Sequence, residues 1–361
     1  MRRIPWGSTT PLGFENKVKY PVQKVPLEEA SEEDFIVIGK ALNSVPEVPA
    51  KLYKSALYRH VLISGATGSG KSHTASIIAE RVSKYLGIPV IIIDWHGEHV
   101  NLLEDYSIIN PFETPLEIFT GDLRDISIIS SILELTPPQE YMLEKIVKKT
   151  DFSKVKTLEA FLDLLEYYPD ESSWMRETKL SLHRKLSVLA RYGEDLFHLA
   201  KHGYSSLNYI LNQSWNKPSI LDVSKIGDIG VRKLYSAFYV KKLVDEAIKA
   251  NQPLVVIIEE AQNYLSRNQP VKPLCDMLRE VRKFNIGLVV ISQSISQLSD
   301  DALMNTNTKI VHSIKARADL EVVEKSLYLE RDLATVLPYL EPGEALYSTP
   351  TLKKPILIKV E

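Results

Sequence analysis

The stretch of sequence that decides the fold is residues 61–98, VLISGATGSGKSHTASIIAERVSKYLGIPVIIIDWHGE. The apolar run at 61–64 predicts a buried strand, and the glycine-rich stretch at 65–72 predicts a loop. From 71 to 87, apolar residues recur with helical spacing and end at a glycine, and 88–94 is typical of a second buried strand. A strand, a helix and a strand in this order predict a right-handed βαβ unit, so we expect an α/β fold.

The sequence on either side of this unit divides into parts of different character. The proline-rich segment 1–55 has one short apolar stretch, FIVIG, which favours an extended arm or a small β element. Residues 56–110 hold the first part of the α/β core, and 111–216 show four helical patterns that predict an inserted helical bundle. Strand and helix patterns alternate again over 217–361, which we assign to the second part of the core. The predicted fold is therefore a mostly parallel sheet with an inserted bundle and a short N-terminal β element.

The strongest functional motif is GATGSGKS, which matches G-x-x-x-x-G-K-[ST]. Glycines let backbone N–H groups wrap around phosphate, and the helix that begins near Lys71 adds its positive end. We expect Lys71 to reach the β- and γ-phosphates of ATP and the Ser72 hydroxyl to bind Mg²⁺. The alternative is a glycine-rich surface turn, which the position between a strand and a helix disfavours. The residues predicted to bind the nucleotide are Gly65, Ala66, Thr67, Gly68, Ser69, Gly70, Lys71, Ser72 and His73.

Carboxylates end two of the predicted strands. The segment 254–262, LVVIIEEAQ, is a buried strand that ends in two glutamates. We predict that Glu259 lies on the magnesium side and that Glu260 is the catalytic base that polarises water. Asp94 ends the strand that we expect next to the glycine-loop strand, where it can position the attacking water or bind metal. The alternative for 254–262 is a strand that ends in solvated charges.

A glutamine and two arginines complete the candidate residues. Gln293 ends the strand IGLVVISQS, where it can hydrogen-bond both the γ-phosphate and the attacking water; the alternative is a polar strand cap. Arg279 and Arg282 share one face of a predicted helix. One of them could reach the γ-phosphate of a neighbouring subunit and stabilise the transition state. Spacing alone favours the alternative, in which both form surface salt bridges of little energetic consequence.

Composition indicates the compartment of the protein and does not decide whether it binds DNA. The chain has 361 residues, with 44 basic and 46 acidic side chains, so it is not coated in positive charge. DNA binding remains compatible with this balance, because a ring can concentrate basic groups in its channel. The single cysteine, Cys275, cannot form an intrachain disulfide, which predicts a cytoplasmic protein. His96 and His99 have no partner at zinc-ligand spacing, so we expect polar loop residues, and the apolar runs are too short to span a bilayer.

Several of these motifs together resemble the HerA/FtsK superfamily of ATPases, with most likeness to HerA-type DNA translocases. The resemblance rests on VLISGATGSGKSHTASIIAE, IIIDWHGE, VVIIEEAQNYL, LREVRKFNIGLVVISQS and LPYLEPGEALYS, and it covers roughly residues 36–361. It implies a RecA-like core that assembles into a hexameric ring around double-stranded DNA, with ATP and Mg²⁺ held between adjacent subunits. The helical insertion also matches the HerA arrangement.

The resemblance carries residue roles with it. It implies that Arg282 is an arginine finger that acts in trans and that Arg59 is a second arginine near the nucleotide. Asp94, Glu260 and Gln293 match the metal-or-water, catalytic and sensor positions of the family.

The chain departs from the family pattern in two places. Glu259 stands where the family has an aspartate, so its longer arm is expected to reach Mg²⁺ only through water. HerA proteins work with a NurA-type nuclease that docks on a longer N-terminal β-barrel. Fewer than sixty residues precede the glycine-loop strand here, so we expect at most a reduced barrel and a weaker case for such a nuclease.

Three functions follow from these patterns. The first is a motor that translocates double-stranded DNA in end processing, transfer or packaging. Its channel contacts would come from the loop 294–300 and from Lys315 and Arg317, although ordinary solvated loops are the simpler interpretation of each. The second is an ATPase that energises a conjugation, type-IV secretion or virus-packaging complex. The third is a nucleotide-dependent assembly module that moves no polymer.

Overall fold

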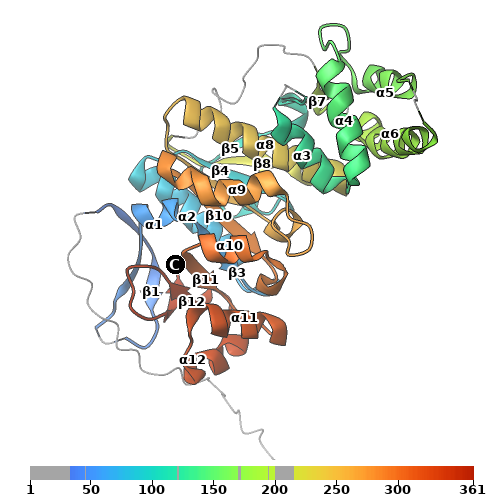
Figure 1. The fold of residues 1–361 in the computed structure, drawn as a ribbon. Helices are drawn as coiled ribbons and strands as arrows, with labels where there is room; N and C mark the ends of the chain where they lie inside the picture. The colour runs from blue at the N-terminus through green and yellow to red at the C-terminus, as the bar shows by residue number, and fades with distance from the viewer. Residues whose placement is uncertain (1–32, 45, 120–121, 170–171, 194, 200–214) are drawn as a thin grey trace, which may run out of the picture.

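The computed structural model describes residues 33–44, 46–119, 122–169, 172–193, 195–199 and 215–361. The predicted N-terminal arm lies outside these residues up to position 32, as does the end of the predicted helical bundle at 200–214. The described part is built around one large sheet, with helices on both of its faces (Figure 1). Among the described helices, none is long and apolar enough to cross a membrane.

The described part of the sheet has eleven strands. Their spatial order is β2 (Pro49–Tyr53), β1 (Phe35–Ala41), β13 (Ile356–Val360), β12 (Glu344–Ser348), β11 (Thr308–Val311), β3 (Val61–Ser64), β10 (Ile286–Ser292), β9 (Leu254–Ile258), β4 (Val90–Asp94), β8 (Ser219–Asp222) and β5 (Ser107–Ile109). The strands from β11 to β5 are parallel. The strands β12, β13, β1 and β2 extend this block with antiparallel pairs. The expected mostly parallel α/β sheet is confirmed.

Alternate residues of the parallel strands point into two separate cores. Ile91 and Ile93 of β4 lie in one hydrophobic cluster, and Val90 and Ile92 lie in the other. The helices α1 (Lys54–Tyr58) and α2 (Lys71–Leu86) bury their apolar stripes in the second cluster. The helices α8 (Ile229–Lys249) and α9 (Lys272–Glu280) cover the first cluster. Strands buried on both faces explain why their sequences are continuous apolar runs.

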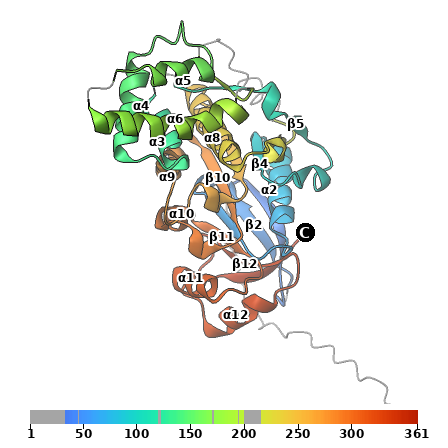
Figure 2. The ribbon, with the colours of Figure 1, turned by 90° about the vertical axis from the view of Figure 1, so that its right-hand side faces the viewer.

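The helical insertion lies at one end of the molecule, away from α11 (Arg317–Leu327) and α12 (Arg331–Val336) (Figures 1 and 2). It contains α3 (Leu123–Ile132), α4 (Pro137–Lys149), α5 (Leu158–Glu166) and α6 (Ser173–Gly193). Each of the four helical patterns in the sequence forms one of these helices. Side-chain caps mark the first residues of two of these helices. Thr136 and Gln139 form a capping box at α4, and the Thr157 side chain caps α5.

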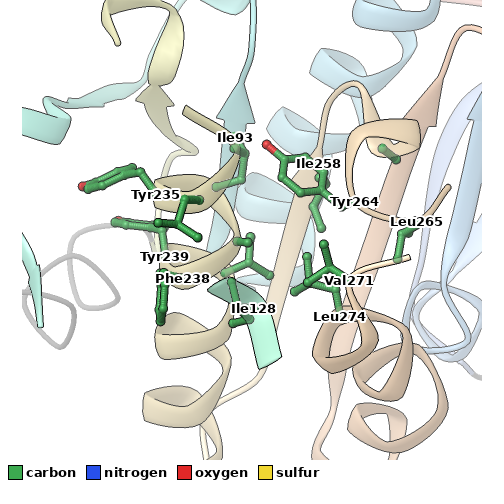
Figure 3. Packing of buried hydrophobic residues seen from close by; sticks show 14 of the residues in the cluster. Ile93, Ile128, Tyr235, Phe238, Tyr239, Ile258, Tyr264, Leu265, Val271 and Leu274 are labelled. Atoms are coloured by element: carbon green, nitrogen blue, oxygen red, sulfur yellow. The ribbon is translucent and has the colours of Figure 1, made fainter. Parts of the chain in front are cut away.

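The insertion and the core share one hydrophobic cluster. Figure 3 shows Ile128 of α3 between α8 and α9, near Phe238 and Leu274. A buried ion network adds a polar link, because Lys241 of α8 lies 2.9 Å from Asp125 and 2.7 Å from Asp122. The insertion is therefore packed directly onto the α/β core.

Several short elements were not expected from the sequence. The predicted N-terminal β element is present as β1, but β2 and α1 follow it, and both strands join the core sheet instead of forming a separate unit. A two-stranded parallel pair, β6 (Leu116–Glu117) and β7 (Phe197–His198), closes the insertion. The helix predicted to carry both Arg279 and Arg282 ends at residue 280, and a 3₁₀ turn, η5 (Val281–Phe284), holds Arg282. Strands of two or three residues are too short to show a periodic pattern.

Candidate nucleotide-binding site

The glycine loop connects β3 to α2 at the carboxyl edge of the parallel strands. Gly68 and Gly70 have φ angles of 75° and 109°, in the left-handed region that glycine adopts without steric cost. A Cβ at Gly70 would also lie 2.9 Å from the backbone nitrogen of Gly343. Helix α2 begins at Lys71, so its first free N–H groups and its positive end face the loop. This geometry suits the anion binding that the motif predicts.

Lys71 reaches back across the loop. Its Nζ atom donates a hydrogen bond to the carbonyl oxygen of Ala66 at 2.9 Å. Burial lowers the pKa of Lys71, and the negative charges of Glu260 and Glu259 oppose that shift. The Lys71 ammonium group therefore lies near acidic side chains beside the loop, where it can contact a bound phosphate. His73, also predicted here, is exposed in the first turn of α2.

Glu259 and Ser72 lie together beside the loop. The Ser72 hydroxyl is 3.5 Å from Glu259 Oε1 and 3.3 Å from Glu98 Oε2. The backbone N–H of Trp95 donates to Glu259 Oε2 at 3.0 Å. A hydroxyl between two carboxylates is a set of hard oxygen donors, which suits Mg²⁺. The residues present therefore fit the predicted metal, and Glu98 is an addition that the sequence did not single out for it.

His99 holds the other side of Glu259. Its Nε2 atom lies 3.0 Å from Glu259 Oε1, and its Nδ1 atom lies 2.8 Å from the Ser76 hydroxyl. Burial opposes the charged imidazole, but the hydrogen bond and charge of Glu259 raise the pKa of His99 overall. The prediction that His99 is a polar loop residue is wrong, because its side chain is completely buried. No local pattern shows this, since its partner lies 160 residues away.

Asp94 ends β4, and the prediction that this strand is next to β3 is wrong, because β10 and β9 lie between them. The Oδ1 atom of Asp94 accepts hydrogen bonds from the backbone N–H groups of His96, Gly97 and Glu98, and its Oδ2 atom accepts one from His99. Burial and the charge of Glu259 raise the pKa of this carboxyl group. Asp94 thus shapes the loop that presents His96 and Glu98. A direct role with water or metal stays a prediction.

Glu260 is the centre of a second polar cluster, which includes Gln293 and Thr67 of the glycine loop. Gln293 Nε2 donates to Glu260 Oε1 at 2.6 Å, and the Thr67 hydroxyl lies 3.4 Å from Gln293 Oε1. His96 Nε2 lies 3.1 Å from Glu260 Oε1, and Gln262 contacts the other carboxylate oxygen. Three separate strands therefore bring a carboxylate, an amide and a loop hydroxyl to one place. The backbone of Glu260 has a φ of 48°, an unusual value for a residue other than glycine.

The two predicted arginines lie elsewhere. Arg59 directly precedes β3, and Arg282 lies in η5 directly before β10. Because parallel strands share their direction, both arginines lie at the amino edge, opposite the glycine loop. The strand β3 has four residues and separates the two edges by roughly 13 Å. Neither arginine therefore joins the phosphate cradle of its own chain. Arg279 instead pairs with Asp301 at 2.6 Å.

A family model described as "Helicase HerA, central domain" matches residues 36–244, more than half of the chain. The chain belongs to the HerA helicase family. It is 26% identical to the DNA double-strand break repair helicase HerA of Saccharolobus solfataricus, a match that covers 94% of this chain and 73% of that protein. Its glycine loop and this membership make it a P-loop ATPase.

Solved structures share the HerA-family fold seen here. VirB4 of Thermoanaerobacter pseudethanolicus superposes with a TM-score of 0.65 at 19% identity and covers 92% of this chain and 98% of its own. The plasmid coupling protein TrwB in complex with ADP and Mg²⁺ superposes with a TM-score of 0.66 at 16% identity and covers 93% and 96%. At these identities the likeness establishes the fold alone.

Proposed function

We propose that this HerA-family chain is a motor that translocates double-stranded DNA as a hexameric ring and hydrolyses Mg-ATP at its subunit interfaces. One observation carries the proposal. The acidic pair that follows β9 lies within bonding reach of the glycine loop, because Ser72 is 3.5 Å from Glu259 and Gln293 joins Glu260 to Thr67. These contacts link segments more than 180 residues apart in sequence.

The residues at the carboxyl edge have separate roles in this proposal. The backbone of the glycine loop and Lys71 bind the triphosphate and orient its γ-phosphate. Ser72, with Glu259 and Glu98, would hold Mg²⁺, which neutralises charge on the phosphates when it is bound. Glu259 is held from behind by His99 and by the N–H of Trp95, so a bridging water is the expected link to the metal.

Glu260 accepts the proton of the attacking water in this proposal. Gln293 already touches Glu260 and Thr67, so a γ-phosphate beside Thr67 would compete for the Gln293 amide and free the Glu260 carboxylate for water. The state of the phosphate would thus be transmitted to β10.

The amino edge supplies the remaining charge to a neighbouring subunit. Arg282 and Arg59 are separated from their own glycine loop by the length of β3, whereas a ring can place them against the loop of the next copy. An arginine that stabilises the transferring phosphoryl group speeds hydrolysis by roughly 10³–10⁵ in other systems. This division of the site supports an oligomer, and the hexamer follows the family resemblance.

Relatives support DNA as the polymer, since the matched Saccharolobus solfataricus protein is named a DNA double-strand break repair helicase. The test measures ATP turnover with and without linear duplex DNA at several salt concentrations, together with the mass of the assembly. We expect stimulation by duplex DNA that falls steeply with salt, since a sequence-independent grip depends on phosphate contacts. Turnover that DNA never stimulates, but that a protein partner does, would favour a secretion ATPase or an assembly module.

A further inference from the structure

The glycine loop rests on two segments from the C-terminal part of the chain. Beneath its first half, the N–H of Ala66 donates to the carbonyl of Ser313, just beyond β11, at 2.8 Å. Beneath its second half, the N–H of Gly343 donates to the carbonyl of Ser69 at 3.0 Å. Both supporting segments lie outside the region matched by the family model, 36–244.

These supports leave the loop little room to move toward the C-terminal segments. A Cβ at Gly65 would lie 2.7 Å from Cβ of His312, and a Cβ at Gly70 would lie 2.9 Å from the nitrogen of Gly343. Both distances are shorter than ordinary contacts, so the glycines are seated directly on the C-terminal segments. The shape of the phosphate cradle therefore depends on what holds those segments in place.

The His312 side chain joins the two supports to the helix that follows the loop. It is completely buried, and burial lowers its pKa to about 4. Its Nδ1 atom lies 2.9 Å from the carbonyl oxygen of Glu344, which can only accept, so Nδ1 carries the hydrogen. The neutral ring then has a bare Nε2 atom, which accepts from the Thr74 hydroxyl at 2.9 Å. One imidazole thus fastens β12 to the first turns of α2.

We propose that His312 is a positioning residue for the nucleotide, which keeps the glycine loop in its phosphate-binding shape by bridging Thr74 and Glu344. The inference rests on the proposed function, since it takes the loop to be the ATP site. His312 touches no phosphate in this proposal and acts only through the loop above it. Without the bridge the loop would be more mobile and would have to be ordered when nucleotide binds. Loss of the bridge should therefore weaken nucleotide binding equally in the ground state and in the transition state.

The test compares substitutions that remove one bond of the bridge at a time. Thr74→Val removes the donor to Nε2 without changing shape, and His312→Gln removes the bond to Glu344. We expect each to raise the Kd for ADP and the KM for ATP by roughly five- to tenfold, the effect of one lost hydrogen bond. The kcat at saturating ATP should stay within about twofold of the wild-type value. Thr74→Ser keeps the hydroxyl and should restore the affinity.

The matched control is Thr308→Val, which removes the buried bond from Thr308 to Thr349 at the other end of β11. It should lower the melting temperature and leave the Kd for ADP unchanged. If Thr74→Val and His312→Gln melt cooperatively and bind ADP as tightly as Thr308→Val does, the bridge is only structural and the proposal is overturned. If the wild-type chain binds no ADP, the proposed function fails, and this inference fails with it.

Discussion

The two edges of the parallel sheet carry opposite chemistry. At the carboxyl edge, Lys71 donates to the glycine loop, Ser72 lies 3.5 Å from Glu259, and Gln293 links Glu260 to Thr67 of the loop. The amino edge carries Arg59 and Arg282, which no described contact joins to the loop of the same chain. Each edge also holds a buried neutral histidine, His312 below the loop and His60 beside Arg282.

If the proposed arginines belong to the active site, one chain carries the two parts of that site on opposite edges and cannot assemble them alone. Strand direction is the cause, because residues before and after the same strand lie at opposite ends of it. Binding groups follow the strands, and the proposed arginines precede them. If the two edges meet in an oligomer, variants at the carboxyl edge should act within their own subunit. Variants at the amino edge should act on the neighbouring subunit.

The largest effect is expected at the carboxyl edge, for Lys71→Ala. Loss of the ammonium group leaves the triphosphate without its point charge, so ATP turnover should become undetectable and ATP binding should weaken strongly. Calorimetric titration with ATP and a phosphate-release assay measure the two quantities. Lys84→Ala, on an exposed position of the same helix, serves as the control and should behave as wild type. Normal turnover in Lys71→Ala would show that the carboxyl edge does not hold the phosphate-binding part of the site.

At the amino edge, Arg282→Ala should lower kcat by roughly 10³ while the oligomer and ATP binding persist. Arg279→Ala is a matched control three residues away, and its exposed ion pair with Asp301 should contribute little. Mixing Arg282→Ala subunits with Glu260→Gln subunits creates some interfaces in which both groups are intact. Recovered turnover in such mixed rings would place the arginine in trans, and intact mixed rings without recovery would contradict it.

Glu260→Gln should retain ATP binding and slow hydrolysis by at least about a hundredfold, since the amide cannot accept the water proton. Single-turnover kinetics separates the chemical step from binding. Gln293→Ala sharpens the assignment, because it removes the donor to Glu260 and should reduce hydrolysis less than the loss of the carboxylate does. A Glu260→Gln variant with wild-type turnover would exclude this residue as the base.

The last prediction concerns stability in acid and not turnover. Burial lowers the pKa of both His60 and His312 to about 4, whereas an unfolded histidine binds its proton near pH 6.5. Between these values the unfolded chain binds more protons than the folded chain. The stabilisation is therefore complete above about pH 6.5 and falls toward pH 4, by up to about 3 kcal/mol per histidine.

Urea denaturation at pH 7, 5.5 and 4.5 measures this dependence. His60→Asn is a suitable variant because an asparagine tolerates the positive φ of 64° at this position and can still accept from the N–H of Leu288. It should flatten the fall in unfolding free energy with decreasing pH. An unchanged slope would show that folding does not lower the pKa of His60.

Sequence patterns predicted the regular elements of the core well and the contacts of the site only in part. The long apolar runs that end at Asp94, Glu259 and Gln293 became parallel strands, since each run had the length and flanking residues of a buried strand. Elements such as β6 and β7 escaped prediction because two residues carry no period. His99 and His312 also escaped it, because their partners lie far away in sequence.

The sequence by itself determined the α/β class, the phosphate-binding turn and the acidic ends of the strands. These depend on local spacing and on the backbone freedom of glycine. Only the tertiary structure decided that Glu259 is held by His99, that the loop rests on residues near Gly343, and that Arg282 lies at the opposite edge of the sheet from its own loop. Such contacts depend on the order and direction of strands in the sheet, which no local pattern specifies.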